Sequence, residues 1–191
     1  RQVTLLVLCP SLGSHVRDRL KQAASSIAEF RYPLIADVYD VGADDGIHFI
    51  VSEYAPGPPL SQLIQTPTTW GPITDTQTLQ LNQGISESQL SASQAVYIAT
   101  QIAQALAFIH EQNLVHGALS PDHITLLSDY SIKIAGMAAG RPEIEKPLTA
   151  VPAYVEPLDY LAPEQIQGQG NTPASDLYAL GTILYEMLAG K

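Results

Sequence analysis

Histidines and carboxylates are the side chains in this sequence that could bind a metal ion or move a proton. His110, His116 and His123 lie six and seven residues apart, which is not a zinc-binding spacing. The single cysteine, Cys9, cannot form an internal disulfide and has no second thiolate beside it. Asp122 offers an oxygen ligand, but an aspartate next to a proline is more often a turn former. These residue types alone therefore predict no metal site.

A helix and a hairpin must position these histidines. The Ser-Ala-Ser-Gln sequence that starts at Ser91 fits a capping box. An apolar stripe at helical spacing follows it, and its members are Ile98, Ile102, Leu106 and Ile109. Farther along, the segments Ile124 to Leu127 and Ile132 to Ala135 indicate a hairpin. The segment from about Ala174 to Ala189 indicates a final apolar helix.

The beginning of the chain has the pattern of a strand, a helix and a hairpin. Val3 to Leu8 is a short apolar run typical of a buried strand. Asp18 to Phe30 has helical spacing, and Pro33 prevents its continuation. Ala36 to Val41 and Ile47 to Tyr54 are rich in strand-forming residues and flank an Ala-Asp-Asp-Gly turn. A helix packed on a small sheet is the expected arrangement.

The composition changes to Pro, Thr, Gln and Gly between Gly57 and Ser91, where only Leu60 to Ile64 keeps an apolar pattern. Compact domains seldom contain structureless loops longer than about 15 residues. We therefore predict an insertion at about residues 65–90, which is either a small hairpin around Thr78 to Asn82 or a mobile contact loop.

Charge and composition exclude several classes of partner. Nine Lys and Arg against nineteen Asp and Glu give a net charge of −10, which repels nucleic acids and anionic lipid surfaces. No run of 18 or more apolar residues is present to span a bilayer, so we expect no membrane contact by this segment. A cytoplasmic location follows as an expectation, although segments beyond either end could tether the protein to a membrane.

Five segments, in the same order along the chain, carry a family resemblance. Leu114 to Ile124 resembles the protein-kinase catalytic loop, whose pattern is H-R-D-L-x-x-x-N. Tyr160 to Gln165 resembles the A-P-E segment, and Ser175 to Gly190 resembles the helix after it. Val38 to Gly46 and Ile50 to Tyr54 look like the fourth and fifth strands and the hinge. The whole is most similar to bacterial serine/threonine protein kinases.

The resemblance implies an α+β, protein-kinase-like bilobal fold that is truncated. Residues 1–55 would form a partial β-rich N-lobe and hinge, with the family's third to fifth strands and helix C. Residues 56–191 would form a partial, mainly helical C-lobe that contains the insertion. The glycine-rich loop and the last helices of the family are absent from the matched pattern.

The residues that perform phosphoryl transfer in the family are replaced at the matching positions. Leu6 stands in place of the phosphate-binding lysine, and Ala23 in place of its glutamate partner. Ala118 stands in place of the catalytic base. His123 and Gly136 replace the asparagine and the aspartate that bind magnesium. The resemblance therefore implies a catalytically inactive, degenerate kinase domain.

Other matching positions imply that the scaffold of the family is retained. His116 and Met137 would be apolar packing elements of the catalytic loop and the D-F-G segment. Asp176 matches the residue that anchors the backbone of the catalytic loop, and Gly181 matches in the same helix. Glu164 matches the glutamate that pairs with an arginine of a later helix.

Nucleotide binding without catalysis is a separate question, because adenine needs mainly apolar walls and backbone hydrogen bonds. The residues that could supply these are Ser52, Glu53, Tyr54, Ala55 and Thr125. Without the lysine or a metal the phosphates gain little stabilisation, so we expect no cofactor, and metal-free ATP is the one nucleotide ligand left open.

The leading hypothesis is a pseudokinase domain that acts as a scaffold or an allosteric regulator and binds a protein partner, such as an active kinase or another signalling protein. The alternative is an unorthodox or weakly active serine/threonine kinase. It would use displaced carboxylates, of which Asp122, Asp40 and Glu53 are the candidates. Metal-dependent binding of ATP separates the two.

Overall fold

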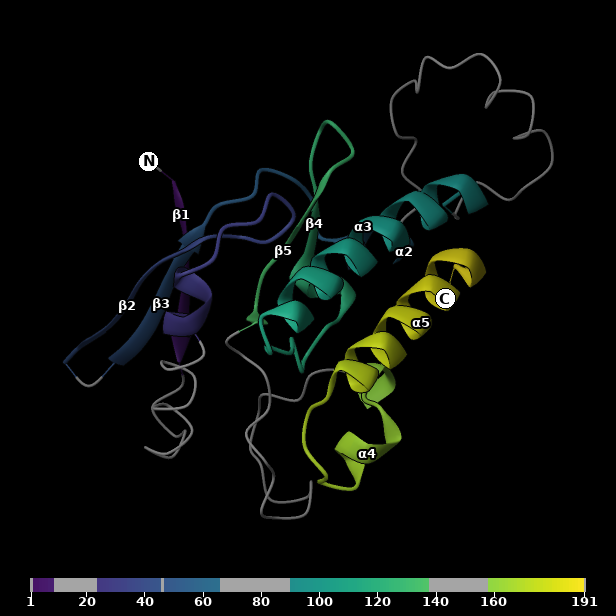
Figure 1. Cartoon of the computed structure of the whole chain (residues 1–191). Coiled ribbons are helices and arrows are strands. Elements are labelled where there is room, and N and C mark those ends of the chain that lie inside the picture. The colour runs from purple at the N-terminus through teal and green to yellow at the C-terminus, as the bar shows by residue number, and fades with distance from the viewer. Residues whose placement is uncertain (1, 9–23, 46, 66–89, 138–157, 191) are drawn as a thin grey trace.

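A computed structural model of the chain describes residues 2–8, 24–45, 47–65, 90–137 and 158–190 (Figure 1). It has a three-stranded sheet near the N-terminus, a two-stranded sheet in the middle and a pair of long helices. The predicted insertion falls almost entirely on residues outside this description, and so does Ala23. The α+β composition agrees with the fold class expected from the sequence.

The three-stranded sheet is antiparallel throughout and has the order β1-β3-β2. Its strands are β1 (Val3–Leu8), β2 (Val38–Asp44) and β3 (Ile47–Glu53). The registers place Leu6 opposite Ile50 on one side and Val41 opposite Ile50 on the other. Three apolar side chains thus meet in one row across the sheet.

The predicted start of the second strand at Ala36 is wrong by two residues. The amide of Ala36 donates to the carbonyl of Ile134, at 2.8 Å, and Ile35 forms a parallel bridge with Ile134. These residues therefore pair with a strand of the other sheet before β2 begins. An apolar pattern alone could not show which sheet would take them.

The predicted helix between the first two strands is present in the described residues 24–28. Its apolar face is buried, with Ala24 fully covered and Ile27 6% exposed. The helix packs these side chains toward Ile50 and Met137. Residues 18–23 of the predicted helix lie outside the described part of the chain.

The core of the larger part is built around α3 (Ala92–Glu111), which packs along α5 (Pro173–Ala189) (Figure 1). The capping box at Ser91 is confirmed, since its hydroxyl accepts from the Gln94 amide and the Gln94 side chain accepts from the Ser91 amide. Length and mean hydropathy would let α3 cross a membrane. Its apolar stripe instead faces the core, with Ile102 completely buried.

The two-stranded sheet lies beside α3 and consists of β4 (Ile124–Leu126) and β5 (Ile132–Ile134). The predicted hairpin is present, and each strand ends one residue earlier than predicted. Short helices complete the described chain, namely α2 (Leu60–Gln65), η2 (Pro121–His123), η5 (Leu158–Tyr160) and α4 (Pro163–Ile166). The first and last side chains of each hairpin strand are buried, and each is at most 4% exposed. This buried hairpin holds the catalytic-loop segment in place.

Candidate functional site

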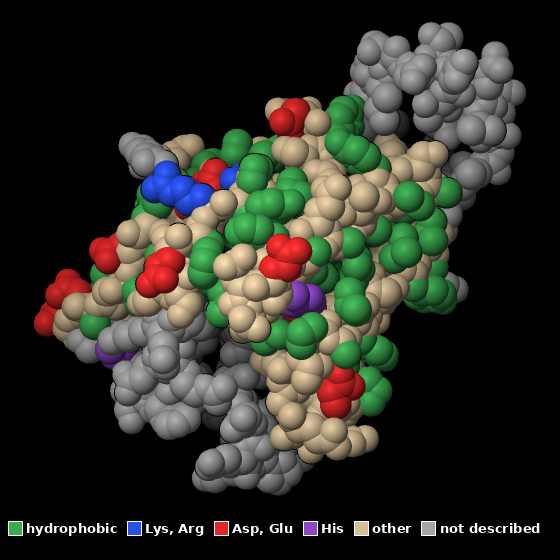
Figure 2. Space-filling view, in the orientation of Figure 1, with side chains coloured by type: hydrophobic (Ala, Val, Ile, Leu, Met, Phe, Trp, Pro, Cys, Tyr) green, Lys and Arg blue, Asp and Glu red, His purple; other side chains and the backbone are tan. Residues whose placement is uncertain are grey.

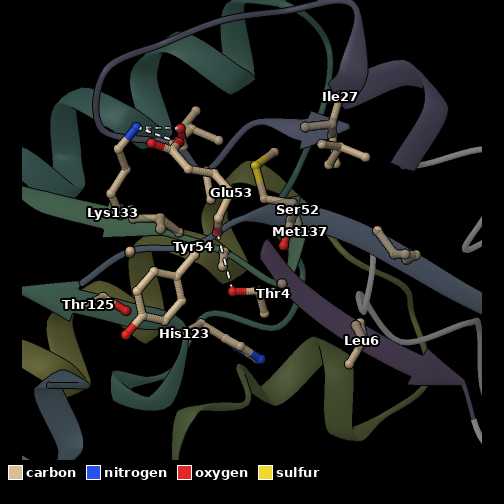
Figure 3. A pocket seen from close by; sticks show the side chains of 18 of the residues that line it. Thr4, Leu6, Ile27, Ser52, Glu53, Tyr54, His123, Thr125, Lys133 and Met137 are labelled. Atoms are coloured by element: carbon tan, nitrogen blue, oxygen red, sulfur yellow. Dashed lines mark hydrogen bonds and ion pairs between the residues drawn. The ribbon is translucent and has the colours of Figure 1, made fainter. Parts of the chain in front are cut away.

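A pocket of about 290 Å³ lies where β1 and β3 face the β4–β5 hairpin (Figure 3). The sequence-predicted residues that line it are Leu6, Ser52, Glu53, Tyr54, Ala55, His123, Thr125, Gly136 and Met137. All five residues proposed for nucleotide binding are thus brought together in one place. Ala118 does not line the pocket and is only 3% exposed.

The edge formed by the end of β3 carries backbone polar groups. One of them is already engaged, since the hydroxyl of Thr4 donates to the carbonyl oxygen of Glu53 at 3.3 Å. The β1–β3 register causes this contact because it places Thr4 opposite Ser52. Both partners line the pocket. A ligand at this edge therefore meets a hydroxyl in addition to backbone groups.

A half-buried ion pair between Glu53 and Lys133 was missed from the sequence. The two charged atoms are 2.7 Å apart, and the side chains are only 27% and 16% exposed. The Lys133 ammonium also donates to the Ile35 carbonyl at 3.4 Å, and the Asp37 amide donates to the Glu53 carboxylate at 3.2 Å. Figure 3 shows the ammonium turned toward the carboxylate of Glu53. The pair joins the two sheets.

A sequence signal for this pair did exist. Lys133 is the only charged residue of the buried strand Ile-Lys-Ile, and a lysine in such a strand is seldom buried without a partner. The partner lies 80 positions away in the sequence. The pattern could thus have predicted that a carboxylate is needed, but not which one supplies it.

His123 occupies the side of the pocket next to Gly136. Its Nδ1 lies 2.8 Å from the carbonyl oxygen of Ala118 and 3.3 Å from the hydroxyl of Ser120. A carbonyl can only accept, so Nδ1 carries the proton and Nε2 is the acceptor of the neutral ring. Burial lowers the pKa of His123 and favours this neutral form.

Gly136 and the His123 ring occupy adjoining space, so a side chain at position 136 would require the ring to move. A Cβ built on Gly136 would lie 2.5 Å from Cδ2 of His123 and 2.8 Å from its Nε2. Gly136 also has a φ of 79°, in the left-handed region that side chains disfavour. The two replacements are therefore linked sterically: the ring fills the space that an aspartate would need.

The catalytic-loop segment is tied to α5 through Asp176, which is 1% exposed. One carboxylate oxygen accepts from the Gly117 amide and the other from the His116 amide, each at 2.8 Å. His110 also donates its Nε2 proton to this carboxylate at 2.8 Å. Asp176 thus contacts the loop backbone where the family resemblance implied an anchor. The role of His110 was not predicted.

His116 lies in the interior, with its Nε2 3.0 Å from the Ala135 carbonyl. Burial lowers its pKa to about 4, and the neighbouring His123 contributes in the same direction. Its Nδ1 has no hydrogen-bond partner among the described residues. Met137 is 6% exposed and belongs to the same core as Ile27. Both histidine and methionine therefore lie among packed side chains.

Two further predicted residues lie away from the pocket. Glu164 is in the first turn of α4, and the structure shows no ionic partner for it among the described residues. Gly181 lies in α5, where an added Cβ would meet no atom within 4 Å. The described residues therefore give no steric reason for a glycine at this position.

The carboxylates considered as replacement metal ligands are not gathered. Asp122 is exposed at the rim of the pocket and accepts a hydrogen bond from the Ser61 hydroxyl. The Asp40 carboxylate is exposed and accepts from the Val41 amide. Within the described part of the chain, no group of three or more His, Cys, Asp or Glu side chains could hold a metal ion.

Comparison with known proteins shows that this chain is similar to protein kinases. The family described as protein tyrosine and serine/threonine kinase matches residues 2–191. A probable serine/threonine-protein kinase of Clostridium acetobutylicum is 31% identical over 173 residues, which cover 91% of this chain and 23% of the relative. The serine/threonine-protein kinase PrkC of Bacillus subtilis is 30% identical over 173 residues, which cover 91% of this chain and 24% of the relative. The chain thus spans about a quarter of the length of these relatives.

A solved structure shows the same fold. The crystal structure of the PknI kinase domain of Mycobacterium tuberculosis has a TM-score of 0.69 to this chain, with 23% sequence identity. The match covers 97% of the chain and 62% of that kinase domain. The predicted kinase-like bilobal fold, in truncated form, is confirmed.

Proposed function

Because this chain belongs to the protein tyrosine and serine/threonine kinase family, we propose that it is a pseudokinase domain without phosphoryl-transfer activity. It would act as a scaffold or an allosteric regulator that binds a protein partner in signalling. The single observation that supports this most is the close approach of the His123 ring to Gly136, where a Cβ would lie 2.5 Å from the ring and a carboxylate could enter only if the ring moved.

Loss of the metal site removes most of the catalytic stabilisation. In kinases, magnesium bridges the phosphates and neutralises the charge that develops during transfer. An aspartate and an asparagine hold the metal ions, and here the matching positions carry Gly136 and His123. A neutral histidine ring offers one nitrogen, whereas magnesium prefers oxygen ligands in octahedral geometry.

The carboxylates that remain near the pocket have other partners. Glu53 is paired with Lys133 at 2.7 Å and also accepts from the Asp37 amide. Asp122 accepts from the Ser61 hydroxyl at the rim. Recruiting Glu53 for a metal would leave Lys133 half-buried without its counterion, which is costly.

The position of the catalytic base is also unsuited to proton transfer. Ala118 has a methyl side chain and is 3% exposed, and its carbonyl is engaged by His123. A positioned general base is typically worth about 10² to 10⁴ in rate. Its loss adds to that of the metal, so transfer above the uncatalysed rate is not expected.

The test is a phosphoryl-transfer assay with radiolabelled ATP, a general protein substrate, and either magnesium or manganese. We expect the chain to match a no-enzyme blank with both metals. The alternative, a weakly active kinase, draws support from the position of Asp122 at the pocket rim. Turnover that Asp122→Asn abolishes and the exposed-site control Asp44→Asn retains would establish that alternative and refute our proposal.

A further inference from the structure

The pocket that remains is formed and mostly apolar, although the catalytic groups are gone. Apolar side chains make its walls: Leu6, Val38 and Ile50 from the strands, Ile27 from the helix before β2, and Met137 from the segment after β5. Its volume of about 290 Å³ is at the lower end of the range of about 300 to 1,000 Å³ for ligand sites. It suits one small organic molecule.

One edge of the pocket carries several polar groups. Thr4 and the carbonyl of Glu53, which it contacts at 3.3 Å, both line this edge together with Ser52. Thr125 adds a hydroxyl from the hairpin opposite. Such an arrangement recognises a flat ligand with donors and acceptors along one side and apolar faces.

The charges of the pocket oppose an anionic ligand. Two carboxylates line it, those of Glu53 and Asp122, and the lysine that lines it, Lys133, is already paired with Glu53 at 2.7 Å. The whole chain also carries a net charge of −10. A triphosphate would therefore enter a field of its own sign without an available counterion in the described pocket walls.

The part of the pocket beyond the polar edge has no group suited to phosphate. Leu6 is apolar, Gly136 has no side chain, and burial of the His123 ring favours its neutral form, in which Nδ1 donates to the Ala118 carbonyl. The ring also restricts the space beside Gly136. A ligand that ends before this region loses nothing, whereas a phosphate chain would have to cross it.

We propose that this pocket binds an uncharged, flat heteroaromatic molecule of nucleoside size, without phosphate and without a metal ion. The polar edge at Thr4 and Glu53 would orient the ligand, and Leu6 and His123 would select against phosphorylated forms. This inference rests on the proposed function, since it assigns the inactive domain a small-molecule site through which it could be regulated.

The first experiment compares adenosine with ATP as probes, by isothermal titration of the intact chain in the presence of EDTA and again with magnesium. We expect adenosine to bind without metal, and at least about tenfold more tightly than ATP. Tighter binding of ATP, a requirement for magnesium or the absence of adenosine binding would each overturn the proposal. An inactive domain that binds no adenosine would leave the proposed function standing.

Variants at Leu6 test the selectivity directly. Leu6→Lys places a cation in the pocket, so ATP affinity should rise about tenfold while adenosine affinity changes little. Leu6→Met is the matched control and should leave both affinities unchanged. If Leu6→Lys keeps the preference for adenosine over ATP and has the melting temperature of the control, charge at this position does not set the selectivity.

Ser52→Phe tests the location. Ser52 lines the pocket from β3, so a ring at this position should block adenosine binding. Circular dichroism and the melting temperature identify any loss of fold. Undiminished adenosine binding by a folded Ser52→Phe protein would place the ligand elsewhere and overturn the assignment.

Discussion

At the scale of single residues, the most informative feature is the exclusion between His123 and Gly136. Restoring an aspartate at position 136 would push a Cβ to 2.5 Å from the histidine ring, at a φ of 79°. Overpacking and a strained backbone together predict that Gly136→Asp lowers the free energy of unfolding by about 2 to 4 kcal/mol.

Combining Gly136→Asp with His123→Asn removes the ring and relieves part of this clash. We expect the free energy of unfolding of the double variant to exceed the value calculated by adding the two single effects by at least about 1 kcal/mol. Urea denaturation of the four proteins in this cycle measures the difference. Additivity of the two substitutions would contradict the linkage between the two positions.

His116 makes stability depend on pH. Its pKa falls from 6.5 in the unfolded chain to about 4 in the folded protein because the ring is buried. The folded form therefore resists protonation. The contribution of His116 to the free energy of unfolding is fully present above about pH 6.5. It decreases as the pH falls toward 4, by up to roughly 3 kcal/mol. Burial lowers the pKa of His123 as well, which adds to the same trend.

Denaturation midpoints between pH 7 and pH 4 measure this effect. His116→Phe lacks the titrating ring, so its midpoint should decline less steeply than that of the unaltered protein, whatever its absolute stability. Equal slopes in the two proteins would show that His116 does not resist protonation in the folded state.

At the scale of elements, the link between α5 and the catalytic-loop segment depends on Asp176. This buried carboxylate accepts from the amides of His116 and Gly117 and from the His110 ring. Asp176→Asn replaces one acceptor oxygen by a donor and removes the charge. We expect the free energy of unfolding to fall by about 3 kcal/mol or more.

Chemical denaturation with Asp44→Asn as the control tests this prediction, because Asp44 is exposed at the end of β2. The control should have the midpoint of the unaltered chain. An Asp176→Asn protein as stable as the control would mean that the three donors find other partners and that the anchor is dispensable.

Elements with local signals were predictable from the sequence. The cap at Ser91 and the apolar stripe of α3 depend on residues within a few positions of each other, and both were found. The start of β2 was misplaced because Ile35 and Ala36 pair with β5, about 100 positions along the chain. Such a choice depends on tertiary packing, which a local pattern does not contain.

The candidate site was predictable to a similar extent. The order of the kinase-like segments along the chain identified the pocket residues. Among those that the structure describes, all except Ala118 line one pocket. The contacts of Thr4 and Lys133 were missed because strand register and an ion pair between residues far apart determine them. The steric exclusion at Gly136 was also missed, since it depends on the conformation of the His123 ring.

At the scale of the whole molecule, two features act together. The Glu53–Lys133 pair and the backbone bonds around Ile134 join the two sheets that enclose the pocket. Acidic side chains are spread over the face shown in Figure 2, while basic side chains are confined to one region of it. A preserved kinase framework is thus combined with a surface and a pocket that disfavour polyanions.

The central claim is that this framework does not hold a divalent cation against a nucleotide. Electron paramagnetic resonance of manganese, titrated with the protein and a non-hydrolysable ATP analogue, tests it most directly. We predict the spectrum of the manganese–nucleotide complex free in solution at every protein concentration. A protein-bound manganese signal that requires the nucleotide and is lost in Asp122→Asn would contradict the claim.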